Sequence, residues 1–166
     1  SKDQADYTAK SLRFGEAGSA FAFVGSGIIE RVSLPIPGEF SVQNAMAAIA
    51  ACLNLGINLT QACTLLGQTK GVPGRFQVLK TTAPFTVIRD YAHTPDAIIK
   101  VLSALRAVTR ARIVTVFGCA GRRDRDKRSK MASAAAGLSD YVVLTSDNPR
   151  DEDEMQIIGD AMPGLQ

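Results

Sequence analysis

Three polar segments hold the side chains of this sequence that are best suited to binding a ligand, and each follows an apolar run. The segments are residues 90–96, 118–124 and 146–150. Ligands of open parallel sheets bind beside the carboxyl ends of the strands. Gly118 and Gly121 would let the backbone approach a ligand closely. If the apolar runs are parallel strands, the three segments meet at one edge, and we predict a site there.

The side chains of these segments suit an anionic or zwitterionic small molecule. Arg123 and Arg150 can each grip a carboxylate with two hydrogen bonds, whereas Asp90 and His93 suit hydroxyl groups and a ring. Each segment also runs into a predicted helix N-terminus, which offers free N–H groups to an anion. A lone histidine beside a helix that begins with proline is often only a local hydrogen-bonding group, and an Asn-Pro pair is common in ordinary turns. The shared position of the segments is therefore what favours a site.

The elements that would position these segments alternate between strand and helix after Thr81. Thr94 suits an N-cap and Pro95 the first position of a helix, and the acidic residues at 151–154 suit another helix N-terminus. The strand candidates are continuous apolar runs, typical of parallel strands buried on both faces. We predict strands at 85–88, 113–117 and 141–145, with helices from Pro95, over 129–138 and from within 151–154.

The first half of the chain is predicted to fold separately, with a domain boundary near residue 80. Short strands are expected at 12–14, 21–24 and 28–34, with a turn at Gly25-Ser26-Gly27. Apolar residues at helical spacing predict a helix over 41–55, capped by Ser41, and a second over 60–69, capped by Thr60. A closing strand is expected at 76–79. The predicted fold class is α/β, with part of a central ATPase-type domain followed by half of a Rossmann-like parallel-sheet domain.

The composition excludes several classes of protein. No apolar run approaches the roughly 20 residues that a membrane helix needs, and residues 1–10 are polar, unlike a signal peptide. The net charge is +3, and residues 122–130 contain six basic and two acidic residues without an aromatic one. This is one local basic loop, not the broad basic face typical of nucleic-acid binding. Cys52, Cys63 and Cys119 lack metal-ligand spacing and indicate reduced thiols in a cytoplasm.

The sequence resembles the Mur ligase family in five motifs that occur in the family's order. They are GEFSVQNA at 38–45, GVPGRF at 71–76, DYAHTPD at 90–96, FGCAGRRD at 117–124 and SDNPR at 146–150. The resemblance covers essentially the whole chain and is firmest over residues 38–155. The DNPR motif is similar to that of family members that add meso-diaminopimelate rather than lysine.

This resemblance implies an enzyme of peptidoglycan synthesis that depends on ATP and Mg²⁺. The carboxylate of a UDP-N-acetylmuramoyl-dipeptide would be activated as an acyl phosphate, and the amino group of meso-diaminopimelate would attack it. Lys127 could face the active centre, but no residue is assigned as catalytic or as a metal ligand. The implied nucleotide contacts are Asn44 and His93 at the adenine, Arg75 near the phosphates and Asp90 at the ribose. The implied amino-acid contacts are Arg123, Asn148 and Arg150, with Asp147 supporting the shape of that motif.

A phosphate-binding loop of the form Gly-x-x-x-x-Gly-Lys-Ser/Thr does not occur in these 166 residues. In the family this loop, a carbamylated lysine and a UDP-binding domain all precede the region that the chain resembles. We therefore expect a fragment that is inactive alone. Residues 1–80 would be the C-terminal portion of the central ATP-binding domain, and residues 81–166 the N-terminal portion of the C-terminal domain. Departures from the family pattern occur at Ser41, Gln77, Arg89, Ala120 and Arg122, the last in place of a common aspartate.

Three alternatives remain open at this point. The chain could belong to a family member specific for lysine, or be a fragment that binds nucleotide or amino acid without turnover. An unrelated Rossmann-type nucleotide protein is poorly supported, because the sequence has no Gly-x-Gly-x-x-Gly. Whether residues 1–37 fold without the missing part of a central domain, and the oligomeric state, are left undecided.

Overall fold

A computed structural model describes residues 5–15, 18–25 and 27–165, and its contacts divide the chain into two units, the second beginning at Tyr91. The architecture is α/β, as predicted. The boundary expected near residue 80 lies in the loop between β4 (Gln77–Leu79) and β5 (Val87–Arg89). These two strands pair with each other, so the residues between them stay with the first unit.

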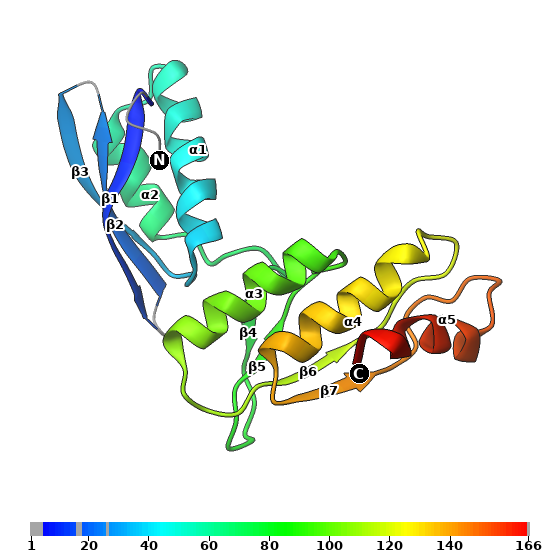
Figure 1. Ribbon diagram of the computed structural model, residues 1–166. Coiled ribbons are helices and arrows are strands. Elements are labelled where there is room, and N and C mark those ends of the chain that lie inside the picture. The colour runs from blue at the N-terminus through cyan, green and yellow to red at the C-terminus, as the bar shows by residue number, and fades with distance from the viewer. Residues whose placement is uncertain (1–4, 16–17, 26, 166) are drawn as a thin grey trace. The chain divides into compact units, whose positions relative to one another are not determined.

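The first unit contains a three-stranded antiparallel sheet in the order β1-β2-β3 (Figure 1). The strands are β1 (Tyr7–Gly15), β2 (Gly18–Gly25) and β3 (Ile28–Leu34), which confirms the three predicted strands and lengthens the first two. The β1–β2 register shifts beside Ser11, whose φ of 53° places it in the left-handed region, as in a β-bulge. Ser26 of the predicted turn lies outside the described residues.

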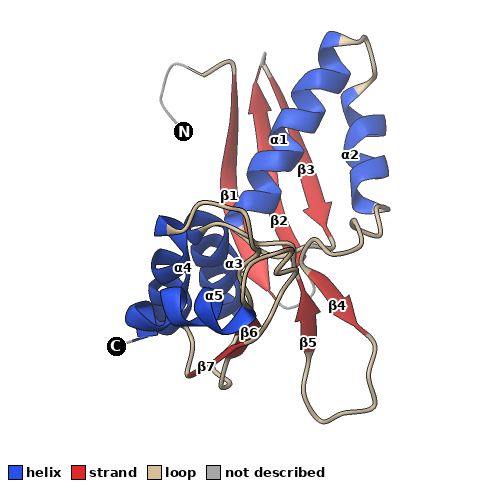
Figure 2. Ribbon diagram, turned by 90° about the vertical axis from the view of Figure 1, so that its right-hand side faces the viewer, coloured by secondary structure: helices blue, strands red, loops and turns tan. Residues whose placement is uncertain are grey.

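Two helices cover one face of this sheet, α1 (Glu39–Asn54) and α2 (Leu59–Gly67), as Figure 2 shows. Alternate residues of a strand point to the same face, and Phe21 and Phe23 on β2 therefore both point toward the helices. Ile49 of α1 packs into the same core and is fully buried. The first unit thus has its own core between sheet and helices.

Both helix starts differ from the predicted ones. The helix α1 begins two residues early, with Gly38 as its N-cap at φ 102°, a conformation that favours glycine. Ser41 is buried in the first turn, and its hydroxyl donates to the carbonyl of Pro37 at 3.0 Å. The cap of α2 is Asn58, whose side chain accepts from the N–H of Gln61, and not Thr60. In both cases a residue just upstream caps the helix.

The prediction that the strand near residue 85 joins a parallel sheet is wrong. This strand, β5, forms an antiparallel pair with β4, with Gln77 opposite Arg89. The Arg89 guanidinium donates to the side-chain oxygen of Gln77 at 2.9 Å, which ties the two strands across the pair. The strand pairs with β4, the strand that precedes it in the chain, and the apolar pattern alone did not predict this pairing.

The second unit contains two parallel strands and three helices. The strands are β6 (Val114–Phe117) and β7 (Tyr141–Leu144), paired in parallel as predicted. The helices are α3 (Pro95–Val108), α4 (Asp126–Leu138) and α5 (Glu154–Ala161), followed by a 3₁₀ turn at Met162–Leu165. Their core includes Ile98, Leu102, Met131, Ala135 and Ile157.

Two of the three predicted helix starts in this unit are confirmed by their caps. Thr94 accepts a hydrogen bond from the N–H of Ala97 at 3.2 Å ahead of α3, and Asp153 accepts from the N–H of Gln156 at 2.8 Å ahead of α5. The helix α4 begins three residues before the predicted Ser129. The segments that lead into α3 and α5 are therefore held by their own side chains.

One face of the β6–β7 pair is exposed among the described residues. Its side chains are Val114, Val116, Tyr141 and Val143, which are 37% to 63% exposed. The expectation that these strands are buried on both faces is therefore wrong for this structure. Helices cover the other face, where Phe117 and Val142 pack against the core.

Asp140 holds the starts of both strands, and we expect its removal to destabilise the unit in a pH-dependent way. Its carboxylate accepts from the N–H of Ile113 at 2.7 Å and from Arg106 at 2.5 Å, and both bonds hold its pKa below the usual value. A lowered folded pKa means that this stability is present above the unfolded pKa, near 3.9, and is lost as the pH falls through the folded one. The Tm of Asp140→Asn should be lower than the Tm of the wild type at pH 7, and this difference in Tm should become smaller at about pH 3. A difference that does not change with pH would contradict this.

Candidate functional site

The segments that follow β6 and β7 lie against each other, as predicted for parallel strands. The N–H of Gly121 donates to the carbonyl of Asn148 at 3.0 Å, and the N–H of Thr145 donates to that of Phe117 at 3.0 Å. A Cβ atom on Gly121 would lie 1.9 Å from the carbonyl oxygen of Pro149. The close approach that this glycine permits is therefore to the neighbouring segment, and not to a ligand as expected.

Gly118 has the same role three residues earlier in the same segment. A Cβ atom there would lie 2.6 Å from the carbonyl oxygen of Thr145 and 2.8 Å from Cβ of Asp147. Both glycines of the second segment are thus required by backbone-to-backbone contact. The two segments form one rigid base for the side chains that they present.

Three arginines and three carboxylates join these segments in a charge-balanced network. The guanidinium of Arg122 pairs with Asp151, and its backbone N–H donates to Glu152. The other carboxylate oxygen of Glu152 lies 3.3 Å from Arg125 and 2.9 Å from Arg128. Arg128 also pairs with Asp160 at 2.8 Å.

Two carboxylates of this network, those of Asp151 and Glu152, have a lowered pKa and stay ionised to lower pH than usual. The pKa of Glu152 is lowered first by the N–H of Arg122 and then by the Arg128 guanidinium. The pKa of Asp151 is lowered chiefly by its bond to Arg122. All three acids of the network face a cation, so the network has no net charge of its own near neutral pH.

The four residues that are expected to bind the amino-acid substrate are exposed and lie beside this network. They are Arg123, Asp147, Asn148 and Arg150. Asp147 accepts a hydrogen bond from the N–H of Asn148 at 2.8 Å, and so shapes the motif. Arg150 has a φ of 56°, a left-handed conformation that is uncommon for a residue with a Cβ atom. In the part of the chain that the structure describes, Arg123 and Arg150 form no ion pair and no side-chain hydrogen bond. Their guanidinium groups are available to a ligand.

His93 lies near the start of α4. The Nζ atom of Lys127 is 3.3 Å from the carbonyl oxygen of His93, which links the segment before α3 to the basic loop. The ring atom Nδ1 of His93 lies 2.9 Å from the carbonyl oxygen of Tyr91. Because a carbonyl can only accept, Nδ1 carries the proton, and Nε2 of the neutral ring is an acceptor. The ring is exposed, so that acceptor can reach a ligand.

The first unit brings together Asp90 and the segment that contains Arg75. Atom Oδ2 of Asp90 accepts from the N–H of Phe76 at 2.7 Å, next to Arg75 in the chain. The rings of Phe40 and Phe76 are 5.9 Å apart, which connects this segment to the first turn of α1. Asn44 is exposed and lies four residues after Phe40, on the same side of that helix. Asp90 is therefore bonded to the residue after Arg75, and Asn44 lies one helical turn after the aromatic partner of that residue.

The predicted site residues are divided between the two units. Asn44, Arg75 and Asp90 belong to the first unit. The others belong to the second unit: His93, Arg123, Asp147, Asn148 and Arg150.

Glu152, Arg128 and Asp160 could not be identified as a connected group from the sequence alone. The acidic run at 151–154 predicts only a helix N-terminus, and the basic loop at 122–130 gives no sign of an ion pair with it. Arg128 is in fact 1% exposed. The apolar spacing of α4 places Arg128 one turn before Ala132, on the buried side, and this was the signal that could have revealed it.

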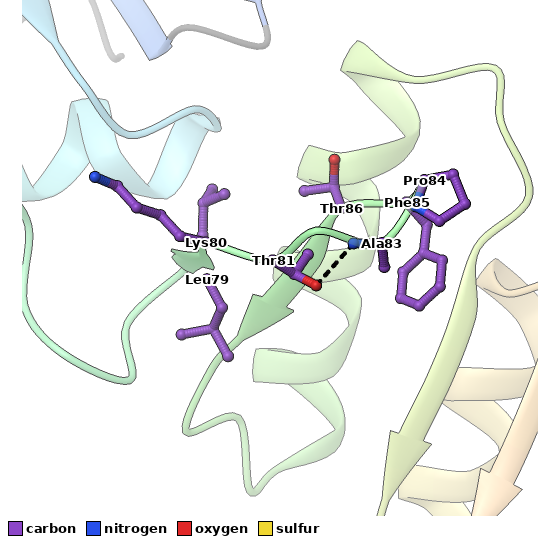
Figure 3. Close-up of a pocket in the computed structure, with 8 residues that line it drawn as sticks. Leu79, Lys80, Thr81, Ala83, Pro84, Phe85 and Thr86 are labelled. Carbon is purple, nitrogen blue, oxygen red and sulfur yellow. Dashed lines mark hydrogen bonds between the residues drawn. The ribbon is translucent and has the colours of Figure 1, made fainter.

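A hollow of about 570 Å³ lies beside the β4–β5 hairpin, as Figure 3 shows. Its lining consists of residues 78–81 and 83–86, and Lys80 is the only lining residue with an ionisable side chain. None of the predicted site residues lines it. Among the residues that the structure describes, no cluster of three or more His, Cys, Asp or Glu side chains could hold a metal ion. Within the same ranges, no helix is long and apolar enough to cross a membrane.

Relatives match almost the whole chain, and a family model matches more than half of it. A family model described as Mur ligase, glutamate ligase domain, matches residues 74–165. UDP-N-acetylmuramoyl-L-alanyl-D-glutamate–2,6-diaminopimelate ligase 1 of Clostridium acetobutylicum is 42% identical over 166 residues, which is 99% of this chain and 34% of the relative. The corresponding ligase of Syntrophomonas wolfei is 41% identical over 164 residues, again 99% and 34%. The chain thus spans about a third of the length of these relatives.

Solved structures of two ligases also match almost the whole chain. A structure of a UDP-N-acetylmuramoyl-L-alanyl-D-glutamate–2,6-diaminopimelate ligase is 38% identical with a TM-score of 0.61, and the match covers 100% of this chain and 34% of that one. The UDP-N-acetylmuramate-alanine ligase of Thermotoga maritima is 29% identical with a TM-score of 0.76, covering 98% and 36%.

Proposed function

The chain belongs to the Mur ligase family, and from this premise we propose that it is part of an ATP-dependent ligase of peptidoglycan synthesis. The proposed reaction adds meso-diaminopimelate to UDP-N-acetylmuramoyl-L-alanyl-D-glutamate, the substrates named for relatives about 40% identical. Residues 1–80 would form the C-terminal portion of the central domain and residues 81–166 the N-terminal portion of the C-terminal domain. The free thiols of Cys52, Cys63 and Cys119 fit a cytoplasmic enzyme.

The distribution of arginines supports the amino-acid assignment most strongly. Arg122, Arg125 and Arg128 are paired with carboxylates of the protein, whereas Arg123 and Arg150 are exposed, and no ion pair is found for either among the described residues. Meso-diaminopimelate differs from lysine by one extra carboxylate on its distal carbon. A site that selects it must supply a cation for that group, because a buried carboxylate without one is strongly disfavoured. The guanidinium groups of Arg123 and Arg150, for which the described residues provide no ion-pair partner, meet this requirement.

Each residue of this site has a role in binding or orientation. Arg150 would grip the distal carboxylate in a bidentate manner, and Arg123 would contribute a second cation. Asn148, whose backbone Asp147 holds, would orient the neighbouring amino and carboxylate groups. Oriented in this way, the amino group that forms the new bond can be held toward the activated carbonyl.

The nucleotide residues would bind one end of ATP. The second oxygen of the Asp90 carboxylate can accept from ribose, while Oδ2 is held by Phe76. Asn44 and the Nε2 atom of His93 suit the adenine, and Arg75 the phosphates. Bound ATP supplies the phosphoryl group that activates the substrate carboxylate, and Mg²⁺ would neutralise its phosphates. We assign no residue of the chain to Mg²⁺.

Amino-acid competition in the full-length protein that contains this chain tests the proposal. The purified protein would be given ATP, Mg²⁺ and UDP-N-acetylmuramoyl-L-alanyl-D-glutamate, with either meso-diaminopimelate or L-lysine, and phosphate release measured. We expect kcat/KM to favour meso-diaminopimelate by at least about 30-fold, the effect of one charged partner in a desolvated site. Equal or better use of lysine would reject the proposed specificity and leave the family assignment intact.

A further inference from the structure

Glu152 occupies the centre of the network that joins the basic loop to the DNPR segment. One of its carboxylate oxygens accepts the backbone N–H of Arg122, and the other accepts from Arg128 at 2.9 Å and Arg125 at 3.3 Å. Its own backbone N–H donates to the carbonyl of Pro149 at 3.0 Å. The side chain of Glu152 is therefore bonded to the basic loop, and its backbone is bonded to the DNPR segment.

Arg128 gives this arrangement its rigidity. The side chain is 1% exposed, and burial of a guanidinium is costly unless it is paired. Its two partners come from different places, Glu152 just after the DNPR motif and Asp160 near the end of α5. A third contact, at 3.5 Å, reaches the carbonyl of Ala120 in the loop after β6. A side chain held in this way fixes the position of Glu152 relative to the start of α4.

Arg150 lies between the two backbone anchors of this network. On one side, Asn148 is tied to Gly121, and on the other, Glu152 is tied to Pro149. The φ of 56° at Arg150 is a strained conformation for a residue with a Cβ atom, and such strain persists only when the surroundings impose it. The anchors on both sides are the surroundings that impose it here.

We propose that Glu152 is a positioning residue for amino-acid binding. It fixes the backbone of the DNPR segment so that Arg150 presents its guanidinium to the carboxylate of the incoming amino acid, and it does not itself contact that amino acid. This inference rests on the proposed function of Arg150 and adds the group that orients it. Because Glu152 orients only Arg150, loss of its carboxylate should weaken the binding of the amino acid and leave the binding of ATP unchanged.

Asp160 provides a matched control in the full-length protein. Glu152→Gln and Asp160→Asn each remove one carboxylate charge from buried Arg128, at 2.9 and 2.8 Å, but only Glu152 is also bonded to the DNPR segment, at Pro149. We expect both variants to lower the Tm by a similar amount. Glu152→Gln should raise the KM for meso-diaminopimelate about tenfold, equivalent to about 1.4 kcal/mol, with the KM for ATP within twofold. Asp160→Asn should leave both KM values within twofold.

Hydrogen exchange of the same variants, measured without substrate, separates this inference from the proposed function. Amides at 146–152 should exchange about tenfold faster in Glu152→Gln and not in Asp160→Asn, whichever amino acid the enzyme uses. If the two variants give the same KM values and the same exchange rates, Glu152 is merely structural and the inference is overturned. If wild type prefers lysine but the exchange difference is found, the proposed specificity fails and the positioning role stands.

Discussion

Replacement of Arg150 by alanine in the full-length ligase is expected to raise the KM for meso-diaminopimelate by at least about 30-fold. Removal of one partner of a desolvated charge pair costs roughly 2–5 kcal/mol, and each 1.4 kcal/mol is tenfold. We place the effect toward the lower end because Arg150 is exposed before the ligand binds. The KM for ATP should change little, because the proposed nucleotide contacts are made by other residues. Steady-state kinetics with each substrate varied in turn measure both values.

Two further substitutions at this position separate charge, geometry and backbone strain. Arg150→Lys should recover only part of the affinity, because an ammonium group cannot make a bidentate contact with a carboxylate. Arg150→Gly should bind as poorly as alanine, yet raise stability by about 1 kcal/mol, because glycine adopts a φ of 56° without the cost that a Cβ atom imposes. If alanine leaves the KM and kcat/KM for meso-diaminopimelate within twofold, Arg150 does not bind the amino acid and only shapes the turn after Pro149.

The substitution Gly121→Ala is expected to damage both stability and amino-acid binding. The added Cβ atom would lie 1.9 Å from the carbonyl oxygen of Pro149 and 2.7 Å from its carbon, and neither backbone atom can move as a side chain would. We expect a loss of about 3 kcal/mol, the upper range for an overpacked site. In a unit of this size that lowers the Tm by about 10–25 °C. Thermal unfolding followed by circular dichroism measures this loss.

Gly159→Ala is the matched control for that experiment. Gly159 lies within α5, and an added Cβ atom meets nothing within 4 Å. Alanine is the better helix former, so this variant should be as stable as wild type or more stable by up to about 1 kcal/mol. If Gly121→Ala and Gly159→Ala unfold at the same temperature, the close contact between the two segments does not exist in solution.

Local signals in the sequence were sufficient for much of the second unit. The Thr94-Pro95 start of α3 and the acidic start of α5 depend on neighbouring residues only, and both are confirmed by their capping bonds. The convergence of the segments after β6 and β7 also followed from two short apolar runs, because parallel strands place their carboxyl ends together.

What the sequence did not reveal depends on contacts between distant residues. The partner of β5 could not be inferred from its apolar residues, because a short strand can pair on either side. Glu152 and Arg122 are 30 residues apart, and only the register of β6 and β7 brings them together. The role of Gly121 was misjudged for the same reason, since the atom that fills its Cβ position belongs to Pro149.

The bond between Arg122 and Asp151 has a consequence for how this site can vary among species. The resemblance to the Mur ligase family implies aspartate at position 122, and an aspartate there would face Asp151 with a like charge. Both side chains are more than half exposed, so each single charge reversal should lower the Tm only slightly, and the exchanged pair Arg122→Asp with Asp151→Arg should restore it. The bond to Glu152 comes from the backbone N–H of residue 122 and is independent of its side chain. The ion pair on the surface of the loop can thus be exchanged while the bond from the backbone of residue 122 to Glu152 is kept.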